Sequence, residues 1–134
     1  MKFPMYVLIA ATLASPLAVL AADHDAHGAA AKHKIELNAG KKWATDDPLR
    51  QAMMAIHASV DVTLPKAHAG KATTAEYDAL SKEVNTQVAY IVQNCKLDPQ
   101  ADAQLHTVIA DILAGAETAA GTQKGKGRAA GVVQ

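Results

Sequence analysis

Apolar residues recur at steps of three and four along three stretches of the chain. The first stretch carries Leu49, Met53, Ile56, Val60 and Leu64. The second carries Tyr77, Leu80, Val84, Val88, Ile91 and Cys95, and the third Leu105, Val108, Ile109, Ile112 and Ala116. Such steps place side chains on one face of an α-helix. The pattern therefore predicts three amphipathic helices.

Short polar segments indicate where each predicted helix begins. In Asp47-Pro48, the aspartate can accept hydrogen bonds from the free amides of a first turn, and proline suits the first helical position. Thr73 and Glu76 have the spacing of a capping box, in which each side chain bonds the backbone amide of the other residue. Asp98-Pro99 repeats the aspartate-proline start. These signals predict helices that begin close to residues 48, 74 and 99.

The helix ends indicate the fold. Pro65 is expected to end or kink the first helix before Gly70 stops it, and Gly121 stops the third. Short connections make neighbouring helices antiparallel. We therefore predict an all-α domain over residues 35–120, an up-down-up antiparallel three-helix bundle. The residues before the first helix form an extended N-terminal strap anchored by Trp43.

The first residues have the layout of a secretory signal peptide. Lys2 precedes the apolar stretch Phe3–Leu20, and Ala21 and Ala22 follow as small residues. An uncleaved membrane anchor is the alternative, but Ser15-Pro16 interrupts a run that is short for a span. We therefore expect residues 1–21 to be a signal peptide, the protein to be periplasmic, and no membrane association after cleavage.

We expect both ends of the mature chain to be disordered. Residues 22–34 form a leader of Ala, Gly, His and Asp without periodicity, and residues 121–134 a glycine-containing basic tail. Cleavage after Ala21 would make His24 the third residue, and its imidazole, two backbone amides and the free amine suit Cu(II) or Ni(II). Cleavage one residue later would weaken this site. The alternative is a polar leader with scattered histidines.

Composition narrows the classes of function. Half the residues are apolar, many are alanine, and the aromatic residues are one Phe, one Trp and three Tyr, which favours closely packed helices. The formal net charge is zero, so no global field attracts nucleic acid. One cysteine excludes an intramolecular disulfide and a multi-cysteine zinc site. No nucleophile or phosphate-loop motif is present, so we do not expect an enzyme.

Three side chains on the predicted helices are candidate ligands. Counting outward from the turns places Met53, His57 and His106 within one or two layers of the bundle. Thioether and imidazole ligands suit Cu(I), or the axial positions of a haem. The alternative is structural, because Met at helical spacing commonly fills a core and a histidine at a stripe margin can extend to solvent.

Cys95 is a further candidate ligand, at the end of the second predicted helix. A buried thiol would be an inert small apolar group, whereas a partly exposed one could bind a soft metal or form an intermolecular disulfide. Because His106 lies about one helical turn deeper than Cys95, a site that used both would need a third ligand or some bending of the helices.

Three segments resemble a known family. They are Lys41–Arg50, Val92-Gln93-Asn94-Cys95-Lys96-Leu97 and Ala101-Asp102-Ala103-Gln104-Leu105-His106. They are similar to small secreted proteobacterial proteins named DnrO, a name associated with nitric-oxide-responsive denitrification genes, over roughly Leu37 to Ala116. The resemblance implies a periplasmic helical protein with a link to nitrogen-oxide or metal stress.

A looser likeness is to periplasmic helical-bundle cytochromes of the b562 type, which use a Met on the first helix and a His on the last. Met53 and His106 occupy comparable places. The departures are the three predicted helices and the lack of a Cys-x-x-Cys-His motif for covalent haem attachment.

Three hypotheses for function follow. The first is a periplasmic protein that binds or handles a metal ion, copper above all, through His106 with His57, Met53 or Cys95. The second is a haem-binding electron carrier. The third is an interaction module whose apolar face docks a periplasmic partner or a second copy as a homodimer.

Overall fold

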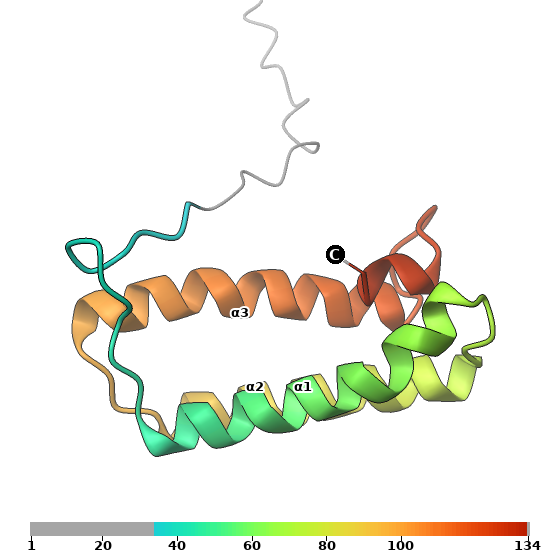
Figure 1. Ribbon diagram of the computed structural model, residues 1–134. Helices are drawn as coiled ribbons and strands as arrows, with labels where there is room; N and C mark the ends of the chain where they lie inside the picture. The colour runs from blue at the N-terminus through green and yellow to red at the C-terminus, as the bar shows by residue number, and fades with distance from the viewer. Residues whose placement is uncertain (1–33, 134) are drawn as a thin grey trace, which may run out of the picture. The chain divides into compact units, whose positions relative to one another are not determined.

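The computed structural model describes residues 34–133, which contain three long helices and one short one (Figure 1). α1 spans Asp47–His68, α2 spans Thr74–Asn94, α3 spans Pro99–Ala119, and the 3₁₀ helix η1 spans Arg128–Gly131. No strand occurs within residues 34–133, and the three long helices pack against one another. The predicted all-α class and the three predicted helices are confirmed.

The start of α1 differs by one residue from the prediction. Asp46, not Asp47, is the N-cap, and its Oδ1 accepts a hydrogen bond from the Leu49 amide at 3.0 Å. Asp47 is the first helical residue and pairs with Arg50. The difference arises because a capping oxygen reaches the third amide after it, and from Asp46 that amide belongs to Leu49. Asp46 therefore holds the first turn of α1.

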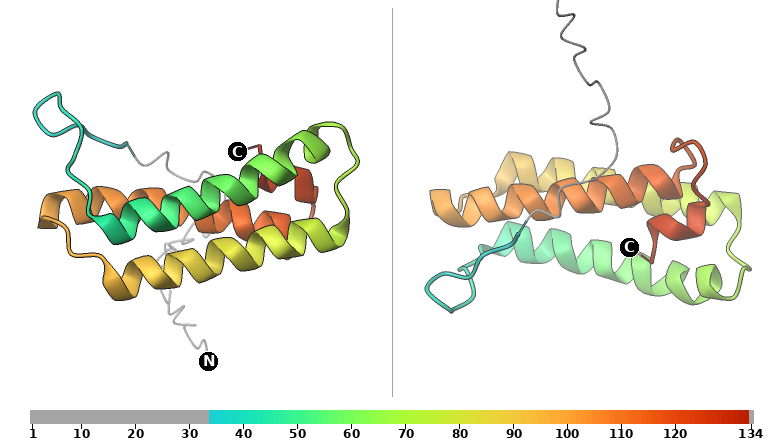
Figure 2. Two further views of the ribbon diagram at one scale, coloured as in Figure 1. Left: turned by 60° about the horizontal axis from the view of Figure 1, so that its bottom comes forward. Right: turned by 90° about the horizontal axis from the view of Figure 1, so that it is seen from above.

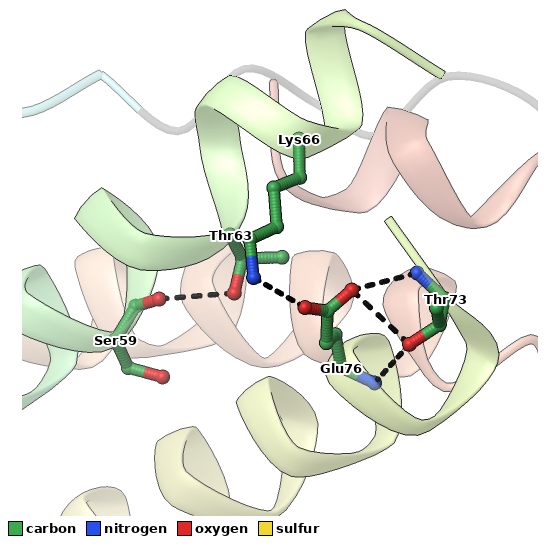
Figure 3. Close-up of polar contacts among 5 residues, drawn as sticks. All are labelled: Ser59, Thr63, Lys66, Thr73 and Glu76. Carbon is green, nitrogen blue, oxygen red and sulfur yellow. Dashed lines mark hydrogen bonds and ion pairs between the residues drawn. The ribbon is translucent and has the colours of Figure 1, made fainter. Parts of the chain in front are cut away.

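The predicted capping box at the start of α2 is confirmed (Figure 3). The Thr73 hydroxyl accepts from the Glu76 amide at 3.3 Å, and the Glu76 carboxylate accepts from the Thr73 amide at 2.8 Å. Lys66 of α1 also binds the Glu76 carboxylate. The lysine, followed by the Thr73 groups, lowers the pKa of Glu76 to about 2. This carboxylate therefore joins the end of α1 to the start of α2.

Pro65 lies inside α1 without ending it. The helix continues through Pro65 to His68, and the reversal comes at Gly70, which has φ +65°. Glycine adopts this left-handed conformation without the steric cost that a Cβ imposes. The predicted stop at Gly70 is therefore confirmed.

The core consists of three clusters of buried residues spread along the domain. One contains Ile56, Leu80, Val84, Val88 and Ala116; a second contains Leu49, Ala52 and Ile91; the third contains Ala67, Tyr77 and Ala119. α1 packs along α2 and α2 along α3, whereas α1 and α3 have few direct backbone neighbours. The bundle is therefore less tightly closed between α1 and α3 than at its other two helix pairs.

The C-terminal segment differs from the disordered tail expected at residues 121–134. η1 folds back against the end of α3, and the half-buried Ala129 and Val132 pack against the core. Arg128 Nη1 donates to Asp78 Oδ1 of α2 at 2.5 Å and to the Ala119 carbonyl at 3.2 Å. The glycines that indicated disorder allow this segment to turn and to approach α3 closely.

The residues before α1 contact the start of α3. The Glu36 amide donates to Gln104 Oε1 at 2.8 Å, and the half-buried Trp43 donates from Nε1 to the Glu36 carbonyl at 2.6 Å. The predicted signal peptide, residues 1–21, lies outside the described residues. Between residues 34 and 133, no helix is both long and apolar enough to cross a membrane.

Candidate functional site

A half-open cavity of about 520 Å³ lies where α1 and α3 fail to close on each other. Its walls come from α1, α2, α3 and the C-terminal segment: Ile56, Val60, Leu80, Val84, Asp111, Ile112, Gly115, Ala116, Ala119, Gly131 and Val132. Figure 2 shows the C-terminal segment between the ends of α1 and α3, where it forms one wall. Ten of these eleven residues are apolar or glycine, so the cavity is suited to an apolar ligand.

Small residues of α3 create the space. Gly115, Ala116 and Ala119 face the cavity and contribute at most a methyl group each. Gly115 also allows the C-terminal segment to approach, because a Cβ built on it would lie 2.8 Å from the Gly131 carbonyl oxygen. The cavity thus arises from the short side chains on α3. The close backbone contact between Gly115 and Gly131 places the C-terminal segment as one of its walls.

The sequence contains one signal of this cavity that the helical pattern does not use. The apolar positions of α3 become small toward its end, in Ala114-Gly115-Ala116 and Ala119-Ala120. Such a face leaves a volume empty unless the facing helix approaches more closely, and α1 and α3 have few direct contacts. Sequence reasoning nevertheless missed Asp111, Gly131 and the C-terminal wall, because their contacts depend on the tertiary fold.

The predicted ligands on α1 have different environments. Met53 is half-buried and packs against two of the core clusters. The His57 side chain is 76% exposed, and its Nδ1 lies 3.0 Å from Asp61 Oδ2 on the same helix. The core therefore accounts for Met53, whereas His57 is a surface residue with a local acidic partner.

His106 on α3 is likewise a surface residue. Its side chain is 73% exposed, and its Nδ1 lies 2.8 Å from the Asp102 carbonyl oxygen and 3.5 Å from Asp102 Oδ2. The nearest polar partners of His106 and of His57 thus belong to their own helices. Packing in the core does not explain the presence of a histidine at either position.

Cys95 lies at the C-cap of α2, half-buried against Leu49, Ile91 and the other residues of their cluster. The Asp46 carboxylate lies beside its thiol. Burial, together with the charge of Asp46, raises the pKa of Cys95 to about 11. The thiol therefore stays protonated at neutral pH, which makes it a poor nucleophile.

Asp46 also joins the start of α1 to the residue that follows Cys95. Its Oδ2 accepts from the Lys96 amide at 2.7 Å, while its Oδ1 caps α1. The Lys96 amide, followed by the Leu49 amide, lowers the pKa of Asp46. Asp46 is thus a stable anion that fixes the end of α2 against the start of α1.

Alkylation of Cys95 at pH 8 should be about 100-fold slower in the native protein than in the unfolded chain. The reason is that a pKa of about 11 leaves about one hundredth of the thiolate that the ordinary pKa of 9.0 gives. Asp46→Asn, which keeps a capping oxygen, should accelerate the native reaction by removing the nearby charge. Rates measured with iodoacetamide test this expectation. Equal rates in native and unfolded protein would contradict it.

The predicted ligands Met53, His57, Cys95 and His106 lie on all three long helices or at their ends. Among residues 34–133, no three His, Cys, Asp or Glu side chains form a group that could hold a metal ion. His24 lies outside the described residues. A copper site and a haem site therefore stay predictions from the sequence.

Comparisons of the chain with protein-family models, with curated proteins and with solved structures find no match. No activity can be transferred to the chain from a matched relative, and the cavity is the described feature with the clearest binding chemistry.

Proposed function

We propose that this protein is a non-enzymatic binding protein that holds a small, largely aliphatic molecule in the cavity between α1 and α3. The observation that carries the proposal is the cavity of about 520 Å³ with aliphatic and glycine walls. Its volume falls in the range of about 300–1,000 Å³ that small-molecule sites commonly occupy. The proposal extends the third hypothesis from sequence, an interaction module without a metal, to a small-molecule partner.

Aliphatic walls determine what such a site can recognise. Ile56, Val60 and Ile112 offer no hydrogen bonds from their side chains, so affinity must come from apolar surface that leaves water. Burial of one methylene contributes about 0.8 kcal/mol, which is about a fourfold change in Kd. Affinity should therefore increase with alkyl chain length until the cavity is full.

Calorimetric titration of the purified protein with 1-hexanol and 1-octanol tests the proposal. We expect 1-octanol to bind about 15-fold more tightly than 1-hexanol, because it buries two more methylenes. Val60→Phe should weaken the binding of both alcohols, because the larger side chain would fill the cavity. Val62→Phe is the matched control, because Val62 is 64% exposed on the same helix and does not line the cavity.

Two results would overturn this function. One is the failure of both alcohols to bind at concentrations up to their solubility. The other is an equal change of affinity in Val60→Phe and Val62→Phe, which would place the alcohols outside the cavity. Circular dichroism of each variant verifies that the helices remain folded.

The proposal includes a periplasmic location after signal-peptide cleavage, as the sequence predicts. It also includes an up-down-up antiparallel order of the helices, supported by the short connections Ala69–Thr73 and Cys95–Asp98. We further propose that residues 35–45 act as an extended strap, supported by the hydrogen bond from Glu36 to Gln104. The link to nitrogen-oxide or metal stress stays a prediction of the family resemblance.

A further inference from the structure

We propose that the ligand of this cavity is a cationic amphiphile, an alkyl chain with an ammonium head group, and that Asp111 at the rim selects the charge of the head. This inference rests on the proposed function and adds the chemical class of the ligand. It is argued from the charge of the cavity rim and from the partners of the aspartates.

Asp111 is the one charged residue among those that line the cavity. It is exposed on α3, while the residues around it in the cavity wall are aliphatic or glycine. A ligand whose chain enters the cavity would therefore bring its head group to the rim, where the carboxylate is in water. The head group can then remain hydrated while the chain loses its contact with water.

Asp111 also differs from every other aspartate between residues 34 and 133, because each of the others has a partner. The caps Asp46 and Asp98 accept from backbone amides. The other four pair with side chains: Asp47 with Arg50, Asp61 with His57, Asp78 with Arg128, and Asp102 with His106. Within the described residues, the Asp111 carboxylate has neither a hydrogen bond nor an ion pair. Its negative charge is therefore available to a ligand.

The sign of this charge decides between head groups. A carboxylate at the rim attracts an ammonium, repels a second carboxylate and discriminates little for or against a neutral hydroxyl. Since Asp111 is exposed, the attraction is that of a surface ion pair, a factor of about two to five in Kd. It should also weaken as salt is added. The apolar walls would supply most of the affinity, and Asp111 would supply the preference among head groups.

Three probes of equal chain length test the inference: octylammonium, 1-octanol and octanoate, titrated at pH 7 and low ionic strength. We expect octylammonium to bind about two- to fivefold more tightly than 1-octanol, and octanoate to bind more weakly by a similar factor. Asp111→Asn should remove both differences, and Asp111→Lys should reverse their order. Glu117→Gln is the matched control, because it removes one exposed carboxylate from the same helix outside the cavity wall and should keep the order.

The outcomes separate this inference from the proposed function. If the three probes bind wild-type protein equally, or if their order survives in Asp111→Asn, the choice of a cationic ligand is wrong while binding of an aliphatic chain stands. If none of the three binds, both the inference and the proposed function fail. A preference for octylammonium that disappears in Asp111→Asn and persists in Glu117→Gln supports the inference.

Discussion

Replacing Ile91 with alanine should lower the free energy of unfolding by about 2–5 kcal/mol. Ile91 is 2% exposed and belongs to the cluster with Leu49 and Ala52, against which Leu105 and Ile109 of α3 also pack. The cluster of Ile91 thus brings together apolar groups from all three long helices. Alanine would leave a cavity that this region cannot fill, because each neighbour is fixed by its own helix. The melting temperature should fall by roughly 10–30 °C.

Val92→Ala is the matched control for Ile91→Ala. Val92 follows Ile91 on α2 but is 73% exposed, so its truncation should change the free energy of unfolding by no more than about 0.5 kcal/mol. Urea denaturation followed by circular dichroism measures both variants. Equal losses in the two variants would contradict the orientation of α2 described above.

The position and orientation of α2 are predictable from the sequence because they depend on local signals. Thr73 and Glu76 satisfy the first free amides of the helix, and a strict step of three and four selects one buried face. Five predicted positions of this face are buried: Tyr77, Leu80, Val84, Val88 and Ile91. The sixth, Cys95, is half-buried because the helix ends one residue before it.

The packing of α3 was less predictable. Ile109 and Ile112 belong to its predicted apolar face, yet both are only half-buried. Periodicity gives the face of a helix but not how closely two helices approach, and here α1 and α3 remain apart. The cavity depends on that distance as well as on the small residues of α3, and the distance is not a local property of the sequence.

The predicted metal ligands show the same difference between what local spacing predicts and what depends on the tertiary fold. Spacing predicts which helix carries His57 and His106, but each has its polar partner on its own helix, one with Asp61 and the other with Asp102. A count of layers fixes the height of a residue in a bundle and leaves its direction around the helix uncertain by tens of degrees. The predicted ligand set of two histidines and Met53 depended on those directions.

Replacing Gly131 with alanine should detach the C-terminal segment from α3. A Cβ at Gly131 would lie 2.3 Å from the Gly115 carbonyl oxygen and 2.5 Å from the Ala119 amide nitrogen. Both are backbone atoms of a helix and cannot move aside as a flexible side chain would, so the segment must shift. Overpacking of this kind typically lowers the free energy of unfolding by about 1–3 kcal/mol. Limited proteolysis should then cleave near Arg128 faster than in the wild-type protein.

Gly127→Ala provides the control within the same segment. Gly127 has φ −70°, which alanine adopts freely, and a Cβ there meets no atom within 4 Å. The stability and the cleavage rate of Gly127→Ala should therefore match those of the wild-type protein. Because Gly131 and Val132 form one wall of the cavity, Gly131→Ala should also weaken 1-octanol binding, whereas Gly127→Ala should leave it unchanged. Unaltered cleavage and binding in Gly131→Ala would mean that the C-terminal segment does not close the cavity. Faster cleavage together with weaker 1-octanol binding, in Gly131→Ala alone, would tie ligand binding to this backbone contact.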